Sequence, residues 1–181
     1  ALWFDRYAIE NSDLVLTDTD AHVSYLRKLT DLNDKPIKKL YIGAKSVSTG
    51  TILSQSQPKT FTVIFAGAFI PLQGPRHVVE AAHILSTLPI NFIMLGAGPL
   101  LDECRALADG YKLNNLRFIG WKSFDTVMQE TITANLALGI FGNTEKAKRV
   151  IPNKVYQAVA VGTPVVTALT PAIQELFSPD Y

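Results

Sequence analysis

From residue 60 onward, short continuous apolar runs alternate with segments of helical period, and this alternation constrains the fold more than any other feature of the sequence. The apolar runs, which we expect to be strands, occupy residues 61–66, 90–95, 116–119, 134–140 and 165–166. The expected helices occupy residues 75–87, 99–109, 124–130, 152–161 and 172–177. Continuous apolar runs are typical of strands buried on both faces, and their alternation with helices predicts a parallel sheet. We therefore predict an α/β domain with a doubly wound parallel sheet that binds its ligand at the carboxyl ends of the strands.

The first 46 residues show a different pattern. They predict two helices and two strands, at 2–10, 13–16, 20–29 and 38–42. These elements cannot enclose a hydrophobic core by themselves, so we interpret residues 1–46 as the end of a preceding domain and the crossover out of it. Residues 47–59 are rich in Ser, Thr, Gln and Gly, which predicts a linker. The second domain then occupies residues 60–181 and is expected to be incomplete at its C-terminal end.

The composition argues against several classes of protein. Charged residues make up 18% of the chain and the net charge is +1, so we expect no nucleic-acid partner. The single cysteine, Cys104, is expected to be a small buried hydrophobe, and the three histidines lack the spacing of metal ligands. We predict neither a metal nor a cofactor. No apolar run approaches the ~18 residues that span a bilayer, and no signal peptide opens the sequence, so we expect a cytoplasmic protein; peripheral attachment to the inner membrane face stays open.

Three strand-to-helix turns combine glycine or a basic residue with proline. Gly67 to Pro75 follows the first expected strand, Gly96 to Pro99 follows the second, and a basic loop containing Lys148 and Arg149 ends at Pro152. We expect each helix to begin at its proline and all three helix N-termini to face one crevice, where N–H groups and helix dipoles favour an anion. The alternative is a set of ordinary crossover loops whose charges are solvated.

Other nucleotide and hydrolase motifs are absent or incomplete. The pair Gly96 and Gly98 lacks the third glycine of a dinucleotide fingerprint, because Leu101 occupies that position, and no acidic residue follows at ribose-binding distance. The sequence contains neither a P-loop nor a nucleophile elbow. Trp121 either caps the edge of the sheet or contacts a ligand. Glu175 is expected on a solvated helix face.

Five motifs in sequence order resemble the second domain of the group 1 (family 4) glycosyltransferases of the GT-B fold. They lie at residues 65–74, 80–82, 94–99, 116–121 and 153–166, so the resemblance covers about residues 60–181. Residues 12–17 and 39–44 are similar to the last strand of the first domain and to the segment that leads out of it. The resemblance implies a fragment that lacks most of the first domain and is inactive by itself.

The family transfers a sugar, with retention at the anomeric carbon, from a UDP- or GDP-linked donor. The resemblance implies an acceptor, a saccharide or a lipid-linked molecule, bound mainly by the absent first domain, and a role in cell-surface polysaccharide synthesis. The implied contacts to the diphosphate are Gly67, Ala68, Gln73, Gly74, Arg149, Asn153 and Lys154. The implied contacts to the nucleoside are Gly96, Gly98, Gly120, Trp121 and Gln157. No catalytic residue is assigned.

The chain departs from the family pattern at four positions. Ala68 and Gln73 stand where members commonly place a basic pair, and Arg149 and Gln157 stand where they place two glutamates. We expect Arg149 to replace the missing loop cations, and Gln157 can still accept a hydrogen bond from a ribose hydroxyl. Alternatively, the chain has lost donor binding and is a non-catalytic binding or scaffolding subunit. A sugar-nucleotide epimerase on the same fold is a third possibility.

Overall fold

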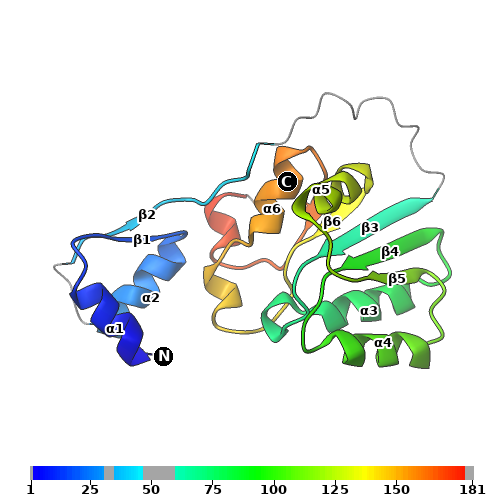
Figure 1. Ribbon diagram of the computed structural model, residues 1–181, viewed down its shortest axis with the longest axis horizontal. Coiled ribbons are helices and arrows are strands. Elements are labelled where there is room, and N and C mark those ends of the chain that lie inside the picture. Colours follow the sequence, from blue (N-terminus) through cyan, green and yellow to red (C-terminus); the bar gives the residue numbers. More distant parts are fainter. Residues whose placement is uncertain (1, 31–34, 47–59, 178–181) are drawn as a thin grey trace. The chain divides into compact units, whose positions relative to one another are not determined.

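The computed structural model describes residues 2–30, 35–46 and 60–177, which form two compact units (Figure 1). The described part of the first unit consists of residues 2–30, 35–42, 148–151 and 169–177, and the second unit contains the remainder. Residues 148–151 and 169–177, which fall within the predicted second domain of 60–181, pack within the first unit. The predicted linker, 47–59, lies outside the described residues.

A five-stranded parallel sheet forms the second unit (Figure 1). The strands are β3 (Phe61–Ala66), β4 (Ile90–Leu95), β5 (Leu116–Ile119), β6 (Leu136–Leu138) and β7 (Val165–Val166). Their order across the sheet is β5-β4-β3-β6-β7, so the chain starts in the centre, builds outward to β5, and then crosses back to build the other half. This order confirms the predicted doubly wound parallel sheet.

Helices cover both faces of this sheet, as the continuous apolar strands predict. Helices α3 (Pro75–Ile84) and α4 (Leu101–Gly110) pack on one face, where the core includes Val63 and Phe65 of β3. Helices α5 (Phe124–Thr133) and α6 (Asn153–Ala160) pack on the other face, where the core includes Ile64 and Ala137. Alternate residues of β3 therefore point to opposite cores. Cys104 is buried in the first of these cores, as expected, and burial raises the pKa of its thiol to about 11.

The prediction that three helices begin at proline is right for one of them. Pro75 is the first residue of α3, and Gly74 precedes it in the left-handed conformation with φ of 64°. Helix α4 begins at Leu101, because Gly98 and Pro99 are still part of the turn after β4. Pro152 precedes α6 with φ of −70° and ψ of 143°, and its carbonyl accepts a hydrogen bond from the Val155 N–H at 2.9 Å. It therefore occupies the cap position, where the backbone is still extended.

The other differences concern the ends of elements. Helix α3 stops at Ile84 instead of residue 87, and α5 continues to Thr133 instead of residue 130. Strand β6 covers only the middle of the expected strand at 134–140. The expected helix at 172–177 is a single 3-10 turn, η3 (Ile173–Glu175). Two further 3-10 turns, η1 (Pro71–Gln73) and η2 (Ala147–Arg149), lie in loops where no helix was expected. Short turns of this kind carry no apolar periodicity that sequence reasoning could detect.

The first unit contains a two-stranded parallel sheet and two helices. The elements are α1 (Leu2–Glu10), β1 (Val15–Thr17), α2 (Asp20–Thr30) and β2 (Ile37–Lys39). Their existence and order were predicted, and α1 has the predicted bounds. The strands are shorter than predicted because the ladder pairs only three residues of each, from Val15 with Ile37 to Thr17 with Lys39.

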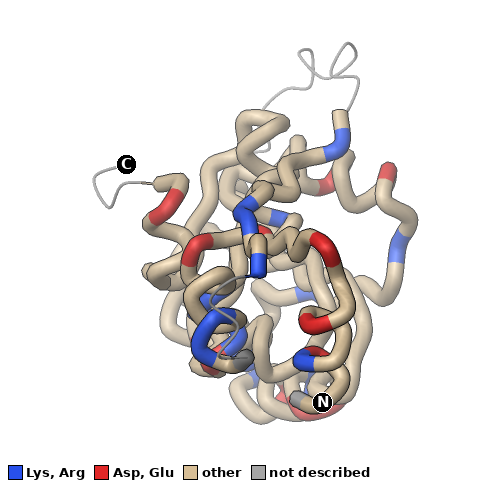
Figure 2. The backbone as a smooth tube through the Cα atoms, turned by 90° about the vertical axis from the view of Figure 1, so that its left-hand side faces the viewer, with Lys and Arg blue, Asp and Glu red and all other residues tan. Residues whose placement is uncertain are grey.

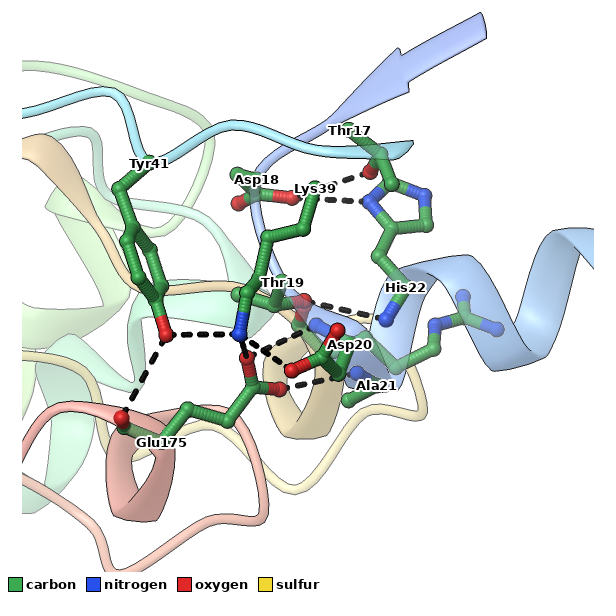
Figure 3. Close-up of polar contacts among 10 residues, drawn as sticks. Thr17, Asp18, Thr19, Asp20, Ala21, His22, Lys39, Tyr41 and Glu175 are labelled. Carbon is green, nitrogen blue, oxygen red and sulfur yellow. Dashed lines mark hydrogen bonds and ion pairs between the residues drawn. The ribbon is translucent and has the colours of Figure 1, made fainter. Parts of the chain in front are cut away.

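Glu175 is not on a solvated helix face, and the prediction for it is wrong. Its side chain is only 13% exposed, and its two carboxylate oxygens accept hydrogen bonds from the backbone N–H groups of Asp20 and Ala21 at 2.8 and 2.9 Å (Figure 3). A carboxylate at this position satisfies two N–H groups at the start of α2 and complements its helix dipole. The capping residue lies 155 positions away in sequence, so helical spacing could not reveal this role.

Lys39 joins the same cluster. Its ammonium group forms an ion pair with Asp20, donates a hydrogen bond to the Tyr41 hydroxyl at 2.9 Å, and lies 3.4 Å from the Glu175 carboxylate (Figure 3). The hydrogen bonds to Asp20 and Tyr41 raise the pKa of Lys39 above its ordinary value. Residues 169–177 are thus attached to the N-terminal elements of the first unit by polar contacts as well as by packing.

Candidate functional site

The topology of the second unit marks one place where a ligand can bind. Strand β4 lies on one side of β3 in the sheet, and β6 lies on the other side. The helices that follow β3 and β4 cover one face of the sheet, whereas those on either side of β6 in the sequence cover the opposite face. In open α/β sheets, ligands bind outside the carboxyl ends of the strands at this switch point.

A cavity of about 400 Å³ lies at that point, within the second unit. Sheet residues such as Ala66, Leu95 and Ala137 line it together with Val127 and Thr131 of α5. Lys154 and Gln157 of α6 also line it, as do Trp121 and Lys122, which follow β5. The cavity therefore combines an apolar lining with a small number of polar groups, as small-molecule sites usually do.

The charged residues that line this cavity are all basic. Lys122 and Lys154 are the charged side chains among the described residues that line it, and no carboxylate is among them. Along the chain as a whole, basic and acidic positions are interspersed (Figure 2), so the absence of carboxylates is a property of this cavity and not of the composition. A cavity with apolar walls whose charged lining residues are all basic favours an anionic ligand.

Lys154 is the most unusual group in the cavity. It lies in the first turn of α6, and its Nζ is buried without a hydrogen-bond partner among the described residues. The nitrogen sits 3.8 Å from the centroid of the Phe65 ring, a contact worth about 0.5–2 kcal/mol to an ammonium group. Burial lowers the pKa of Lys154 well below its ordinary value, because the ring supplies no counter-charge. A buried amine without a hydrogen-bond partner is a candidate functional group.

Gly67 and Gln73 adjoin this ammonium group. A Cβ atom added to Gly67 would lie 3.2 Å from Lys154 Nζ and 3.0 Å from Gln73 Oε1. Gln73 Oε1 is itself buried without a hydrogen-bond partner among the described residues. Two unpaired polar atoms thus flank the space that a side chain at position 67 would occupy, and Gly67 keeps that space open.

The glycines of the other turns allow loops to pack closely. A Cβ at Gly96 would overlap the carbonyl oxygen of Gly67, and a Cβ at Gly98 would lie 2.6 Å from the carbonyl oxygen of Phe69. A Cβ at Gly74 would lie 2.7 Å from the Gly142 nitrogen. The first two glycines have φ of 134° and 153°, which other residues rarely adopt. Close contact between loops is therefore sufficient to explain glycine at these positions.

The cavity brings together part of the predicted site. Six predicted residues line it: Gly67, Ala68, Gly96, Trp121, Lys154 and Gln157. Gln73, Gly74, Gly98, Gly120 and Asn153 belong to the same unit but are not among the lining residues. The expectation that three helix N-termini face one crevice is wrong, since α6 contributes its first turn whereas α3 and α4 contribute none of their first residues.

Arg149 belongs to the first unit and does not line this cavity. Its guanidinium carbon lies 3.4 Å from the centroid of the Tyr25 ring, and its carbonyl accepts a hydrogen bond from Thr19. The Thr19 hydroxyl also accepts a hydrogen bond from the His22 N–H at 3.0 Å, which caps α2. Arg149 therefore has a structural role within the first unit.

Lys122, Val127 and Thr131 line the cavity but were not predicted. Lys122 could have been found, because it follows a predicted strand next to Trp121. Val127 and Thr131 are four residues apart on one face of α5, and this pattern cannot be told from ordinary core packing. Trp121 is 78% exposed although it lines the cavity, so its ring is available for contact with a ligand.

In the described ranges of the chain, no group of three or more His, Cys, Asp or Glu side chains is arranged to hold a metal ion. Within the same ranges, no helix has the length and apolar character needed to cross a bilayer.

Comparison with known proteins identifies one family. A family model described as glycosyl transferases group 1 matches residues 60–180, and the search of curated proteins returns no match. The crystal structure of Anabaena Alr3699/HepE in complex with UDP and glucose matches this chain with a TM-score of 0.76 and 18% sequence identity. The match covers 98% of this chain and 51% of HepE. The pneumococcal O-GlcNAc transferase GtfA, in complex with UDP and GlcNAc, is 14% identical with a TM-score of 0.72, at 93% and 32% coverage.

A third structure is WaaG, a glycosyltransferase involved in lipopolysaccharide biosynthesis. It is 16% identical with a TM-score of 0.68, and the match covers 88% of this chain and 45% of that one. Identities this low show a shared fold. The chain spans about half, or less, of the length of these three proteins.

Proposed function

Since the chain belongs to the group 1 glycosyltransferases, we propose that the cavity of the second unit binds the nucleoside diphosphate of a sugar donor. The donor's sugar is transferred to an acceptor with retention at the anomeric carbon. Solved structures with this fold, HepE and GtfA, carry UDP, and UDP and GDP are the first candidates for the nucleotide.

The buried, unpaired amine of Lys154 is the observation that carries this proposal. Its Nζ is without a protein partner among the described residues, in a cavity whose charged lining residues are lysines. A phosphate oxygen would provide the missing charge and hydrogen bond. When the nucleoside diphosphate leaves the sugar, negative charge develops on its phosphates. A cation already in place stabilises that charge without reorganisation.

The remaining lining residues have proposed roles along the nucleotide. Trp121 stacks on the base, and Gln157, one turn after Lys154 on α6, accepts a hydrogen bond from the ribose. Gly67 and Ala68 cover the diphosphate. Asn153, Gln73 and the glycines at 74, 98 and 120 remain predicted contacts of the bound donor, and Arg149 remains a predicted contact of its diphosphate.

Several features of the whole protein are also proposals. The reaction proceeds without a metal or another cofactor, because Lys154 supplies the positive charge. A saccharide or lipid-linked acceptor binds mainly to a domain of which this chain contains the end. The protein works in the cytoplasm or at the inner membrane face, and builds a cell-surface polysaccharide.

A second candidate is a non-catalytic binding or scaffolding subunit on the same fold. It is favoured by the neutral side chains Ala68, Gln73 and Gln157, which stand where the resemblance leads us to expect charged ones. These substitutions remove charges from the proposed donor site, so its affinity could be too low for catalysis. Formation of a glycosylated product from a sugar nucleotide, lost in a Lys154→Gln variant, would eliminate this candidate.

Titration calorimetry of the full-length protein with UDP and GDP tests the proposal. We expect one of them to bind, and Lys154→Gln to weaken the binding strongly. Lys112→Gln is the matched control, because Lys112 is exposed in the turn between α4 and β5, at the opposite edge of the sheet from the cavity. Failure of both nucleotides to bind at millimolar concentration would refute the proposal.

A further inference from the structure

No carboxylate among the described residues lines the cavity beside Lys154, and Glu145, in the loop between β6 and α6, is exposed and outside the lining. Among the described elements packed on α6, helix α5 carries Asp125, which is exposed, and Glu130, which is half-buried; neither lines the cavity. Strands β6 and β7 carry no ionisable side chain, and neither does β3 or the loop of residues 67–74 that follows it. On α6 itself the other ionisable group is Tyr156. The nearest charged lining residue is Lys122, of the same sign.

The polar side-chain atom that shares the space beside Gly67 with this amine is neutral. Gln73 Oε1 and Lys154 Nζ flank the same open space beside Gly67, 3.0 and 3.2 Å from the position of an added Cβ. An amide oxygen can accept a hydrogen bond from the amine but cannot balance a full charge. The ring of Phe65, 3.8 Å away, is also uncharged.

We propose that the cavity takes up one proton when its anionic ligand binds. In the ligand-free protein Lys154 is a neutral amine. When a diphosphate enters, the amine takes a proton from the buffer, and the resulting ammonium group pairs with a phosphate oxygen. This inference rests on the proposed function for the identity of the ligand, and it adds that binding and protonation of the site are coupled.

Burial lowers the pKa of Lys154 in the ligand-free protein, and an adjacent anion raises it. Between these two pKa values the complex holds one proton more than the free protein. Linkage then makes the affinity fall tenfold for each unit by which the pH rises. Outside that interval the affinity does not depend on Lys154 protonation.

The coupling is measured by calorimetry of the full-length protein with UDP-glucose, at one pH near 8 and in two buffers of different ionisation enthalpy. The doubly esterified diphosphate of this probe lacks the terminal phosphate ionisation near pH 6, so it releases and takes up no proton itself. We expect the two measured heats to differ by the difference in buffer ionisation enthalpy, which corresponds to one proton taken up per ligand bound.

Lys154→Arg is the control, because arginine stays protonated throughout this pH range. We expect the variant to bind without buffer-dependent heat and with a flat pH profile, whereas Lys112→Gln keeps the wild-type coupling. Binding by the wild type with equal heats in both buffers would overturn the inference while leaving the proposed function intact. Coupling that persists in Lys154→Arg would assign the proton to another group and would also overturn it.

A second measurement does not depend on the choice of ligand. The Lys154 side chain is followed by NMR in the free protein, and its signal is identified by its loss in Lys154→Arg. We expect the chemical shift of a neutral amine at pH 8. The shift of an ammonium group at that pH would contradict the inference even if UDP-glucose does not bind.

Discussion

Lys39 in the first unit and Lys154 in the second have opposite surroundings, and their pKa values are shifted in opposite directions. Lys39 contacts two carboxylates and a tyrosine hydroxyl, and these contacts raise its pKa. Lys154 is buried without a hydrogen-bond partner among the described residues, and burial lowers its pKa. The first arrangement is complete by itself, because each charge has its partner within the protein.

This difference separates a structural site from a binding site. Buried polar groups in folded proteins are nearly always satisfied, and an exception needs an explanation. The cluster around Glu175 needs no ligand, because it joins residues 169–177 to the start of α2 and to β2. Lys154 Nζ is unsatisfied by the described protein atoms, and the proposed anionic ligand would supply its missing partner.

The largest expected effect is on nucleotide binding by Lys154→Met. Loss of a charge-assisted hydrogen bond costs about 1.5–3 kcal/mol, so we expect the affinity for UDP or GDP to fall roughly 10- to 100-fold. Lys39→Met should leave that affinity unchanged, because Lys39 lies in the other unit and contacts its own carboxylates. Titration calorimetry of both variants checks this; equal losses would remove the distinction between the two lysines.

Glu175→Gln should lower the stability of the protein by about 1–2 kcal/mol. The amide keeps the shape of the side chain but loses the charge that complements two N–H groups of α2 and Lys39. Urea unfolding measures the change. Glu103→Gln is the control, since its side chain is 53% exposed and a change within about 0.5 kcal/mol is expected there. A Glu175 variant as stable as this control would show that the cap is not needed.

Gly67→Ala should weaken nucleotide binding roughly tenfold, about 1.4 kcal/mol, while the protein stays folded. The added methyl group occupies the space between Gln73 Oε1 and Lys154 Nζ, at 3.0 and 3.2 Å from them. Gly110→Ala is the matched control, because a Cβ there meets nothing within 4 Å. Unchanged affinity in Gly67→Ala would mean that the ligand does not use this space.

The smallest expected effect is a gain in stability, by about 1 kcal/mol near pH 7, when Lys154 is replaced by Met in the ligand-free protein. The folded state depresses the pKa of Lys154, so between that depressed pKa and the unfolded value of ~10.4 the unfolded state binds more protons, and wild-type stability rises with pH in that range. The advantage of the variant should therefore shrink as the pH approaches 10. Thermal unfolding at several pH values measures this trend, and an advantage that grows with pH would contradict it.

The sheet and most helices could be predicted from the sequence, because the spacing of their apolar residues indicates which side chains are buried. Runs such as 61–66 and 90–95 are apolar except for Thr62 and Asn91, and their strands have the predicted bounds. The Lys154 region was also recognisable, since a basic residue at a helix start after a strand is a local pattern. Local patterns, however, do not reveal whether a charge is paired.

The errors in the prediction come from contacts between residues far apart in sequence. Glu175 was expected to be solvated because helical spacing says nothing of a partner 155 positions away. Sequence reasoning also missed the contact of Arg149 with Tyr25 within the first unit. The close approach of the Phe69 backbone to Gly98 could not be predicted either, because these residues are 29 positions apart.

The most direct test of the central claim is an experimental structure of the full-length protein with UDP or GDP bound. The account predicts phosphate oxygens within about 3 Å of Lys154 Nζ, at the carboxyl ends of β3 and β6. A bound nucleotide whose phosphates lie elsewhere, with Lys154 Nζ still lacking an anionic partner, would contradict it.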